Sequence, residues 1–321
     1  MRGTDYVLKR VAFAIVTVFV AVTINFVLFR LAPGSAVTNL SRVPHATQQL
    51  RHALEVQFGL NKSKGQQYLI YLKQLAHGNL GVSFENEQPV TKNLRVALIN
   101  TLPMVMLGTV FSILLGTLTG VIAAWRRGTP AEALTVSSAL GFYSMPTHWL
   151  GLMLIIIFAG VLPTGGMTNE FLLNPSFWTH LRDLASHIAL PSLTLGLVLY
   201  GEYTLIVRSA MLETLGEDYI LTARAKGLRP WTIVRKHALR NAMLPIATLV
   251  ALSLGYVVAG AILIETVFSW PGSGLLLNSA IFQRDLPLLQ GTILVLALFF
   301  VVLNLLVDIA QAAIDPRIKR S

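Results

Sequence analysis

The chain has 321 residues, of which 54% are hydrophobic and only 12% are charged, and its mean hydropathy is +0.64. This composition excludes a soluble globular domain, where roughly a quarter of residues are charged, and it predicts an integral membrane protein. The absence of cysteine excludes disulfides, thiolate metal sites and cysteine nucleophiles. The net charge of +10 does not by itself indicate nucleic acid, because the basic residues stand where membrane topology places them.

Six apolar stretches alternate with short charged segments, and each is long enough to cross a hydrocarbon core of about 30 Å. We expect spans near residues 11–29, 96–125, 133–162, 187–208, 244–264 and 287–307. Pro146 should kink the third span, because proline removes a helix hydrogen bond. Gly108, Gly116 and Gly120 should let another helix approach the second span, either within the chain or from a partner. Basic residues favour a cytoplasmic location for both termini.

These spans divide the chain into three parts. We expect residues 1–30 to form a cytoplasmic N-terminus and the first helix, and residues 31–95 to form an extracytoplasmic helical region. Residues 96–321 are expected to form the transmembrane core, with helices 2–6 and a cytoplasmic loop at 209–243. Gly59 and Gly78 stand where helix-ending glycines belong. Two apolar triplets in this region each share a helical face, Leu50, Leu54 and Phe58, and Tyr68, Leu72 and Leu75.

A polar, basic segment from Gly216 to Pro245 separates the fourth span from the fifth. Acidic residues Glu217 and Asp218 precede basic Lys226, an order that suits the dipole of a short helix. Gly227 should end this helix and Pro230 should open a second one. Anchoring to anionic lipid would explain the positive charge, but it would not require two ordered helices joined by a sharp turn.

The wording of this segment resembles the cytoplasmic coupling loop of permease subunits of ABC importers. DYILTARAKGL at 218–228 and HALRNAMLP at 237–245 are similar to the peptide branch, the oligopeptide and dipeptide permeases. The resemblance to this family extends to two other parts of the chain, LFRLAPG at 28–34 and ETVFSWPGSGLLLNSAI at 265–281. Two departures are visible: Leu221-Thr222-Ala223 replaces the usual Glu-Ala-Ala opening, and the gap from Gly227 to Leu244-Pro245 is longer than in sugar-type permeases.

The resemblance implies an all-α integral membrane protein with six transmembrane helices, the type I importer permease fold, and a small helical extracytoplasmic region after helix 1. It implies a bacterial cytoplasmic (inner) membrane subunit that forms half of a path for di- or oligopeptides delivered by an extracytoplasmic binding protein. Oligosaccharides and nickel complexes are the alternative substrates. The implied partners are a second homologous permease in a heterodimer, two ABC ATPase subunits, the binding protein and membrane lipid.

The same resemblance, together with the position of charged residues, predicts three groups of site residues. The ATPase-coupling residues are Glu217, Asp218, Tyr219, Thr222, Ala223, Arg224, Ala225, Lys226, Gly227 and Leu228. Because charge within a membrane is costly, the path or its gate is expected at Glu202, Asn304 and Asp308. The alternative for Asp308 and Glu202 is a structural pair with a base at the cytoplasmic boundary, such as Arg208 or an arginine of the coupling loop, and this alternative is favoured for Asp308. Binding-protein docking is expected at Glu265, Trp270 and Pro271.

No catalytic or metal-binding residues are predicted. The sequence contains no GxxxxGK[ST], HExxH or GxSxG pattern, so ATP and magnesium are expected on the partner ATPases and no cofactor on this chain. A membrane enzyme would need a facing nucleophile and base, and a lone secondary transporter would need inverted repeats and buried midplane charges. Both remain rival hypotheses with less support in the residues.

Overall fold

The structure, a computed structural model, describes residues 3–31, 62–169, 171–172, 174–243 and 261–314. These residues are almost entirely helical, and the β-structure among them is an isolated bridge between Val82 and Pro89. Four helices in this part of the chain are long and apolar enough to cross a membrane: α1 (Gly3–Leu31), α5 (Val90–Trp125), α8 (Phe177–Leu215) and α13 (Leu286–Ile314). The predicted all-α membrane class is confirmed.

The third predicted span is a broken helix pair. α6 (Pro130–Ser144) and α7 (Thr147–Phe158) are bent by 107°. Pro146 causes the break, because a proline disfavours α conformation in the residue before it, and Met145 is extended with ψ of 132°. The predicted kink is therefore confirmed, but it is a complete interruption, and the helix ends at Phe158 rather than near residue 162.

Most of the fifth predicted span, 244–264, lies outside the described residues. Its last residues belong to a helical stretch at 261–267.

The fourth predicted span corresponds to α8, which begins ten residues before the expected start and ends seven residues after the expected end. Its Ser176 N-cap accepts a hydrogen bond from the Thr179 amide, and no break follows. At 1.5 Å per residue the 39 residues of α8 extend about 58 Å, nearly twice the thickness of a hydrocarbon core. One or both of its ends therefore project beyond the membrane.

The chain packs as two compact units, Met1–Thr101 with Pro271–Ser321, and Leu102–Trp270. α5 is continuous from the first unit into the second. The predicted boundaries at residues 30 and 95 separate segments by their location inside or outside the membrane. The packing of the chain into units does not test that location, so these boundaries stay a prediction.

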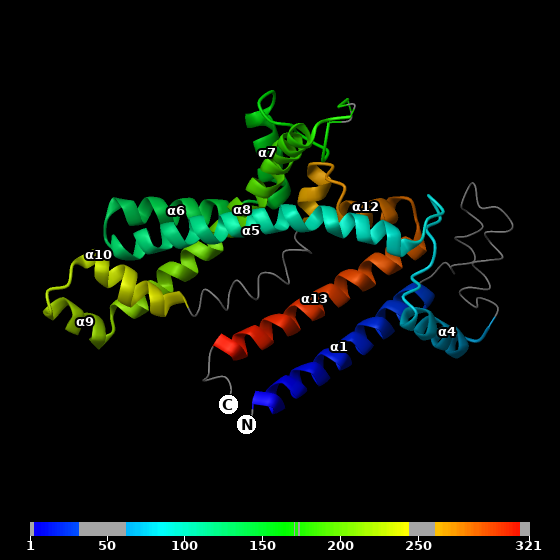
Figure 1. The fold of residues 1–321 in the computed structure, drawn as a ribbon, viewed down its shortest axis with the longest axis horizontal. Coiled ribbons are helices and arrows are strands. Elements are labelled where there is room, and N and C mark those ends of the chain that lie inside the picture. The colour runs from blue at the N-terminus through cyan, green and yellow to red at the C-terminus, as the bar shows by residue number, and fades with distance from the viewer. Residues whose placement is uncertain (1–2, 32–61, 170, 173, 244–260, 315–321) are drawn as a thin grey trace. The chain divides into compact units, whose positions relative to one another are not determined.

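In the first unit α1 and α13 lie side by side, and α4 (Lys64–Ala76) packs on them (Figure 1). Tyr68, Leu72 and Leu75 face a cluster formed by α1, α4 and α13, as their spacing predicted. Gly78 ends α4 with φ of +70°, and the Asn79 amide donates to the Gln74 carbonyl in a Schellman motif. The other predicted triplet and Gly59 lie outside the described residues.

A buried carboxylate organises the other end of this unit. Asp285 is 1% exposed, and its Oδ2 accepts hydrogen bonds from the Ser83 hydroxyl at 2.5 Å and the Phe84 amide at 2.9 Å. Its Oδ1 accepts from the Leu288 amide at 3.1 Å in the first turn of α13. Asp285 thus caps α13 and holds the turn that precedes α5, beside α12 (Ser273–Phe282).

In the second unit, α8 packs against α5, α6 and α7, and glycine permits the close approach of α5. A Cβ built on Gly108 would stand 2.8 Å from the Ser192 carbonyl oxygen, and one on Gly120 would stand 2.8 Å from the Thr204 carbonyl oxygen. Real Cβ atoms do not come that close, so α5 and α8 touch through backbone here. These glycines therefore serve packing within the chain.

Candidate functional site

The predicted pair of short helices is present in the polar segment. The first, α9 (Asp218–Ala225), begins after extended Glu217 and has Asp218 in its first turn. Gly227 follows the helix with φ of +74°, its amide donates to the Arg224 carbonyl, and the Leu228 amide donates to the Ala223 carbonyl. This is a Schellman ending, which strongly favours glycine at that position. The predicted helix stop at Gly227 is confirmed.

The second helix opens where Pro230 predicted. α10 (Pro230–Thr232) has the proline at its first position and continues as a π-helix, η1 (Ile233–Ala238), into helical residues 239–243. The Asn241 side-chain amide donates to the Tyr219 hydroxyl at 2.6 Å, which ties the second helix back to α9. The two helices therefore form a closed elbow.

One face of α9 is anchored in a hydrophobic cluster. Ile220 is 1% exposed and Ala223 is 5% exposed. They contribute to a cluster of apolar residues from α5, α8, η1 and the helical residues that follow η1: Val121, Ala124, Val207, Ala210, Met211, Ile233, Val234, Ala238 and Ala242. Burial of this face fixes α9 to the end of α8, so the elbow is held against the long helix.

The opposite face of α9 is open. Of the ten residues predicted to couple to an ATPase, nine are exposed: Glu217, Asp218, Tyr219, Thr222, Arg224, Ala225, Lys226, Gly227 and Leu228. Ala223 is the exception, because its position on the helix turns it inward to the cluster. Ala223 therefore supports α9 from within rather than offering contact surface.

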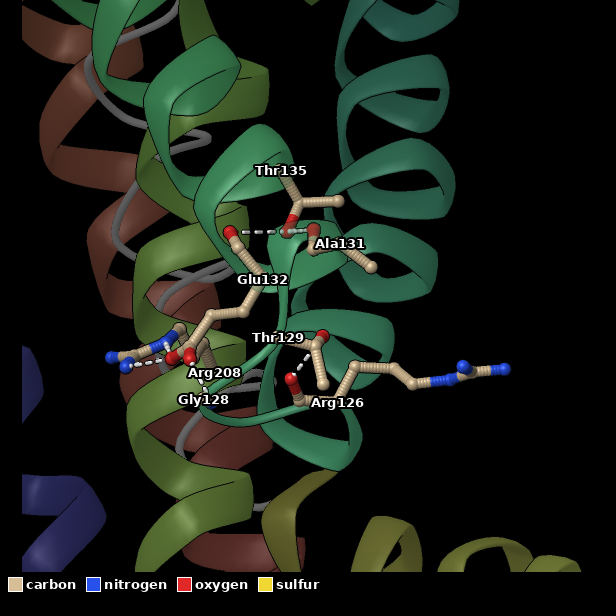
Figure 2. A network of polar contacts seen from close by, with 7 residues as sticks. All are labelled: Arg126, Gly128, Thr129, Ala131, Glu132, Thr135 and Arg208. Atoms are coloured by element: carbon tan, nitrogen blue, oxygen red, sulfur yellow. Dashed lines mark hydrogen bonds and ion pairs between the residues drawn. The ribbon is translucent and has the colours of Figure 1, made fainter.

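A charged contact connects α8 to the first turn of α6. Figure 2 shows Arg208 directed at Glu132, whose Oε1 accepts from Nε of Arg208 at 2.9 Å and also from its Nη2. The second oxygen of Glu132 accepts from the Gly128 amide at 2.6 Å. One carboxylate thus joins α8, the start of α6 and the preceding turn.

The polar residues predicted for the path lie in different environments. Asp308 pairs with Arg10 of α1, with Nη1 and Oδ2 3.2 Å apart. A pair with a base was expected for Asp308, but Arg208 is not its partner, because that side chain is held by Glu132. Asn304 lies one turn earlier on α13 and its side-chain amide donates to the Phe300 carbonyl. Glu202 is partly buried on α8, in the second unit.

The residues predicted to dock a binding protein are mostly buried. Glu265 and Trp270 are both 0% exposed, and the Trp270 amide donates to the Glu265 carbonyl at 2.8 Å. Trp270 belongs to the main apolar cluster of the second unit. Pro271 is exposed. A docking surface at this segment would therefore use Pro271 and its surface neighbours, with Glu265 and Trp270 shaping the segment from below.

Residues that sequence reasoning missed are the partners of these contacts. Glu132, Arg10 and Asp285 were not singled out as site residues. Glu132 could have been noticed as the acidic residue directly before a long uncharged span, where a charge is costly unless it is paired. Nothing in the sequence indicates which base would pair with it.

The sequence of this helical membrane protein matches a known family of transport components. Residues 116–320 match the family described as "Binding-protein-dependent transport system inner membrane component". The chain belongs to this family and is the membrane component of a binding-protein-dependent transport system. The resemblance to ABC importer permeases of the peptide branch is thereby confirmed.

Named relatives agree over nearly the whole chain. It is similar to the dipeptide transport system permease protein of Escherichia coli (strain K12), 35% identical over 335 residues covering 98% of both proteins. It is 37% identical over 332 residues to the di/tripeptide transport system permease protein of Pseudomonas aeruginosa (strain UCBPP-PA14), with 98% of both covered. It is 40% identical over 322 residues to a putative peptide permease protein of Brucella ovis, again with 98% of both covered.

Proposed function

We propose that this chain is one of two permease subunits of an ATP-driven importer that carries short peptides across the bacterial inner membrane. An extracytoplasmic binding protein delivers the peptide, and two separate ATPase subunits supply the energy. The second permease is a homologous chain, both termini face the cytoplasm, and the two permeases share the path. The functions named for relatives matched over their full length support peptides over oligosaccharides and nickel complexes.

The exposed face of α9 is the observation that carries the coupling part of this proposal. A helix that transmits force needs one face free for the motor and another fixed to the element that must move. α9 has both, because Ile220 and Ala223 are buried in the cluster at the end of α8 while nine predicted contact residues are open. Closure of an ATPase groove around α9 would therefore move α8 as a rigid body.

Glu132 and Arg208 extend this connection from α8 to α6. Their side chains are partly shielded, with 15% and 30% exposure, so their attraction is screened less than that of a surface pair. Through the Gly128 amide the same carboxylate also holds the turn after α5. A displacement of the inner part of α8 would thus reach two other membrane helices together.

Gly227→Val is the variant that tests coupling. A Cβ at this position would meet open space, so the substitution adds no clash, but a β-branched residue at φ of +74° costs about 1–3 kcal/mol of backbone strain. We expect insertion of the intact transporter to be preserved and peptide uptake per ATP hydrolysed to fall severalfold. Uptake and hydrolysis are measured together in proteoliposomes that contain all subunits.

Gly160→Val provides the matched control. Gly160 has φ of +80° and equally open surroundings, but it follows α7 and is not part of the elbow. Normal coupling in the Gly227 variant, or an equal loss in the Gly160 variant, would contradict a coupling role for α9. Gly227→Asn should retain more transport than Gly227→Val, because asparagine tolerates positive φ better.

A further inference from the structure

A groove of about 280 Å³ opens between α1 and α13 of the first unit, toward the ends that carry the chain termini. Phe13 and Ala14 of α1 and Val301 and Leu305 of α13 give it apolar walls. Further along, the same two helices close on each other in the cluster that receives α4. The groove is therefore confined to one half of the helix pair.

The mouth of the groove is polar and carries both signs of charge. Arg10 donates through Nε to the Tyr6 hydroxyl at 3.2 Å, and its Nη1 lies 3.2 Å from Oδ2 of Asp308 in an ion pair. Among the described residues, Nη2 of Arg10 and Oδ1 of Asp308 have no hydrogen-bond partner. Asn304, one turn deeper, uses its amide nitrogen on the Phe300 carbonyl and keeps its oxygen available.

Both helices are candidate spans, so the groove lies against the acyl region of a bilayer. Water is a poor occupant of an apolar space of this size, roughly nine water volumes, because ordered water needs two to four polar partners. An acyl chain suits the walls, and the mouth then faces the head-group layer. The guanidinium of Arg10 can donate to a phosphate. The neighbouring oxygens of Asp308 and Asn304 can accept from a primary ammonium, so the mouth suits a head group that carries both.

We propose that the groove binds one phosphatidylethanolamine molecule, the zwitterionic phospholipid with a primary ammonium head group. The acyl chain lies along Ala14 and Val301, the phosphate accepts from Nη2 of Arg10, and the ammonium donates to Asp308 and Asn304. Phosphatidylcholine has no N–H to donate to these oxygens. Phosphatidylglycerol brings no positive charge to Asp308. The site therefore selects by head group as well as by apolar fit.

Lipid retention by the whole transporter tests the head-group selection. The complex is purified in mild detergent, exchanged against equal mixtures of the three phospholipids, and its bound lipid is measured by native mass spectrometry. Wild type should retain phosphatidylethanolamine over the other two by about tenfold, the effect expected for a hydrogen bond to a charged group. Asp308→Asn should lose most of this preference and raise the relative retention of phosphatidylglycerol.

Loss of the Arg10–Asp308 pair by itself could loosen the helices, and that structural effect would lower the retention of all three lipids together. A change in the ratio between head groups is therefore the decisive measurement. Equal retention of the three lipids by wild type, or an unchanged ratio in Asp308→Asn, would overturn the proposal.

The position of the lipid is tested with a filled groove. Ala14→Phe should abolish selective retention, whereas Val16→Phe, which places the same side chain at an exposed α1 residue outside the groove, should not. Because the chain has no cysteine, Ala14→Cys gives the only thiol of this chain for a photoreactive label, which is attached to the purified chain before assembly with the other subunits. Labelled complex should cross-link to phosphatidylethanolamine. Cross-linking to another polypeptide instead would show that a protein occupies the groove and would overturn the lipid assignment.

Discussion

Replacing Ile220 by alanine removes the side chain that anchors α9. Ile220 is 1% exposed in the cluster shared with α5, α8 and η1, so truncation loses buried contacts and leaves a cavity. Such substitutions cost about 2–5 kcal/mol. Since Ile220 acts at the seat of a short helix, most of this loss should appear as easier local detachment of α9. A loss of about 2 kcal/mol raises the detached population about 30-fold.

Trypsin provides the assay, because Arg224 and Lys226 place two cleavage sites on and just after α9. When detachment is fast relative to cleavage, the cleavage rate follows the detached population, so Ile220→Ala should be cut at least about 30-fold faster than wild type. Leu221→Ala is the matched control, since Leu221 is 67% exposed on the same helix. Its cleavage rate should change little.

Equal cleavage of the two variants would refute the argument that burial of one face holds the elbow. The same outcome would remove the mechanical basis for coupling through α9. Faster cleavage combined with normal peptide uptake would keep the packing argument but contradict the need for a rigid elbow.

Two further predictions concern helix contacts in the second unit. Glu132→Gln and Arg208→Gln should each lower the melting temperature of the purified transporter, and the double variant should lose less than the sum of the two single losses, because the two side chains pair with each other. Additive losses would contradict an attractive contact between them. Gly120→Ala should lower the melting temperature because its Cβ meets the α8 backbone, whereas Gly141→Ala, in open space on α6, should leave it unchanged or raise it through better helix propensity. Equal shifts in the two glycine variants would argue against close contact of α5 with α8.

The elbow could be predicted from the sequence because its signals are local. Gly227 and Pro230 act through their own backbone preferences, and the order of charges from Asp218 to Lys226 acts within a few turns of helix. Pro146 likewise predicted a break by a local rule. The angle of 107° could not be predicted, since it depends on how α7 packs against α8 and the residues around Phe268.

The polar contacts between distant parts of the sequence could not be predicted for a different reason. Glu132 and Arg208 are 76 residues apart, and Ser83 and Asp285 are 202 residues apart. Their meeting depends on how whole helices associate, and hydrophobic periodicity indicates only which face is apolar, not which neighbour it meets. The burial of Ala223, Glu265 and Trp270 was not predicted. Helix spacing and sequence motifs identify a functional segment, but they do not show which of its side chains point into the protein.

Because η1 is a π-helix, the segment that follows Gly227 can tolerate a change in its number of residues. A π-helix closes its hydrogen bonds over five residues instead of four, so it stores an extra residue without lengthening the helix by a full step. Deleting one residue within Ile233–Ala238 would let this stretch rewind as an ordinary α-helix while its flanks keep their orientation. The same deletion in α9 would rotate every later side chain by about 100°. The second arm of the elbow can thus lose one residue without turning its flanks, whereas the first arm cannot.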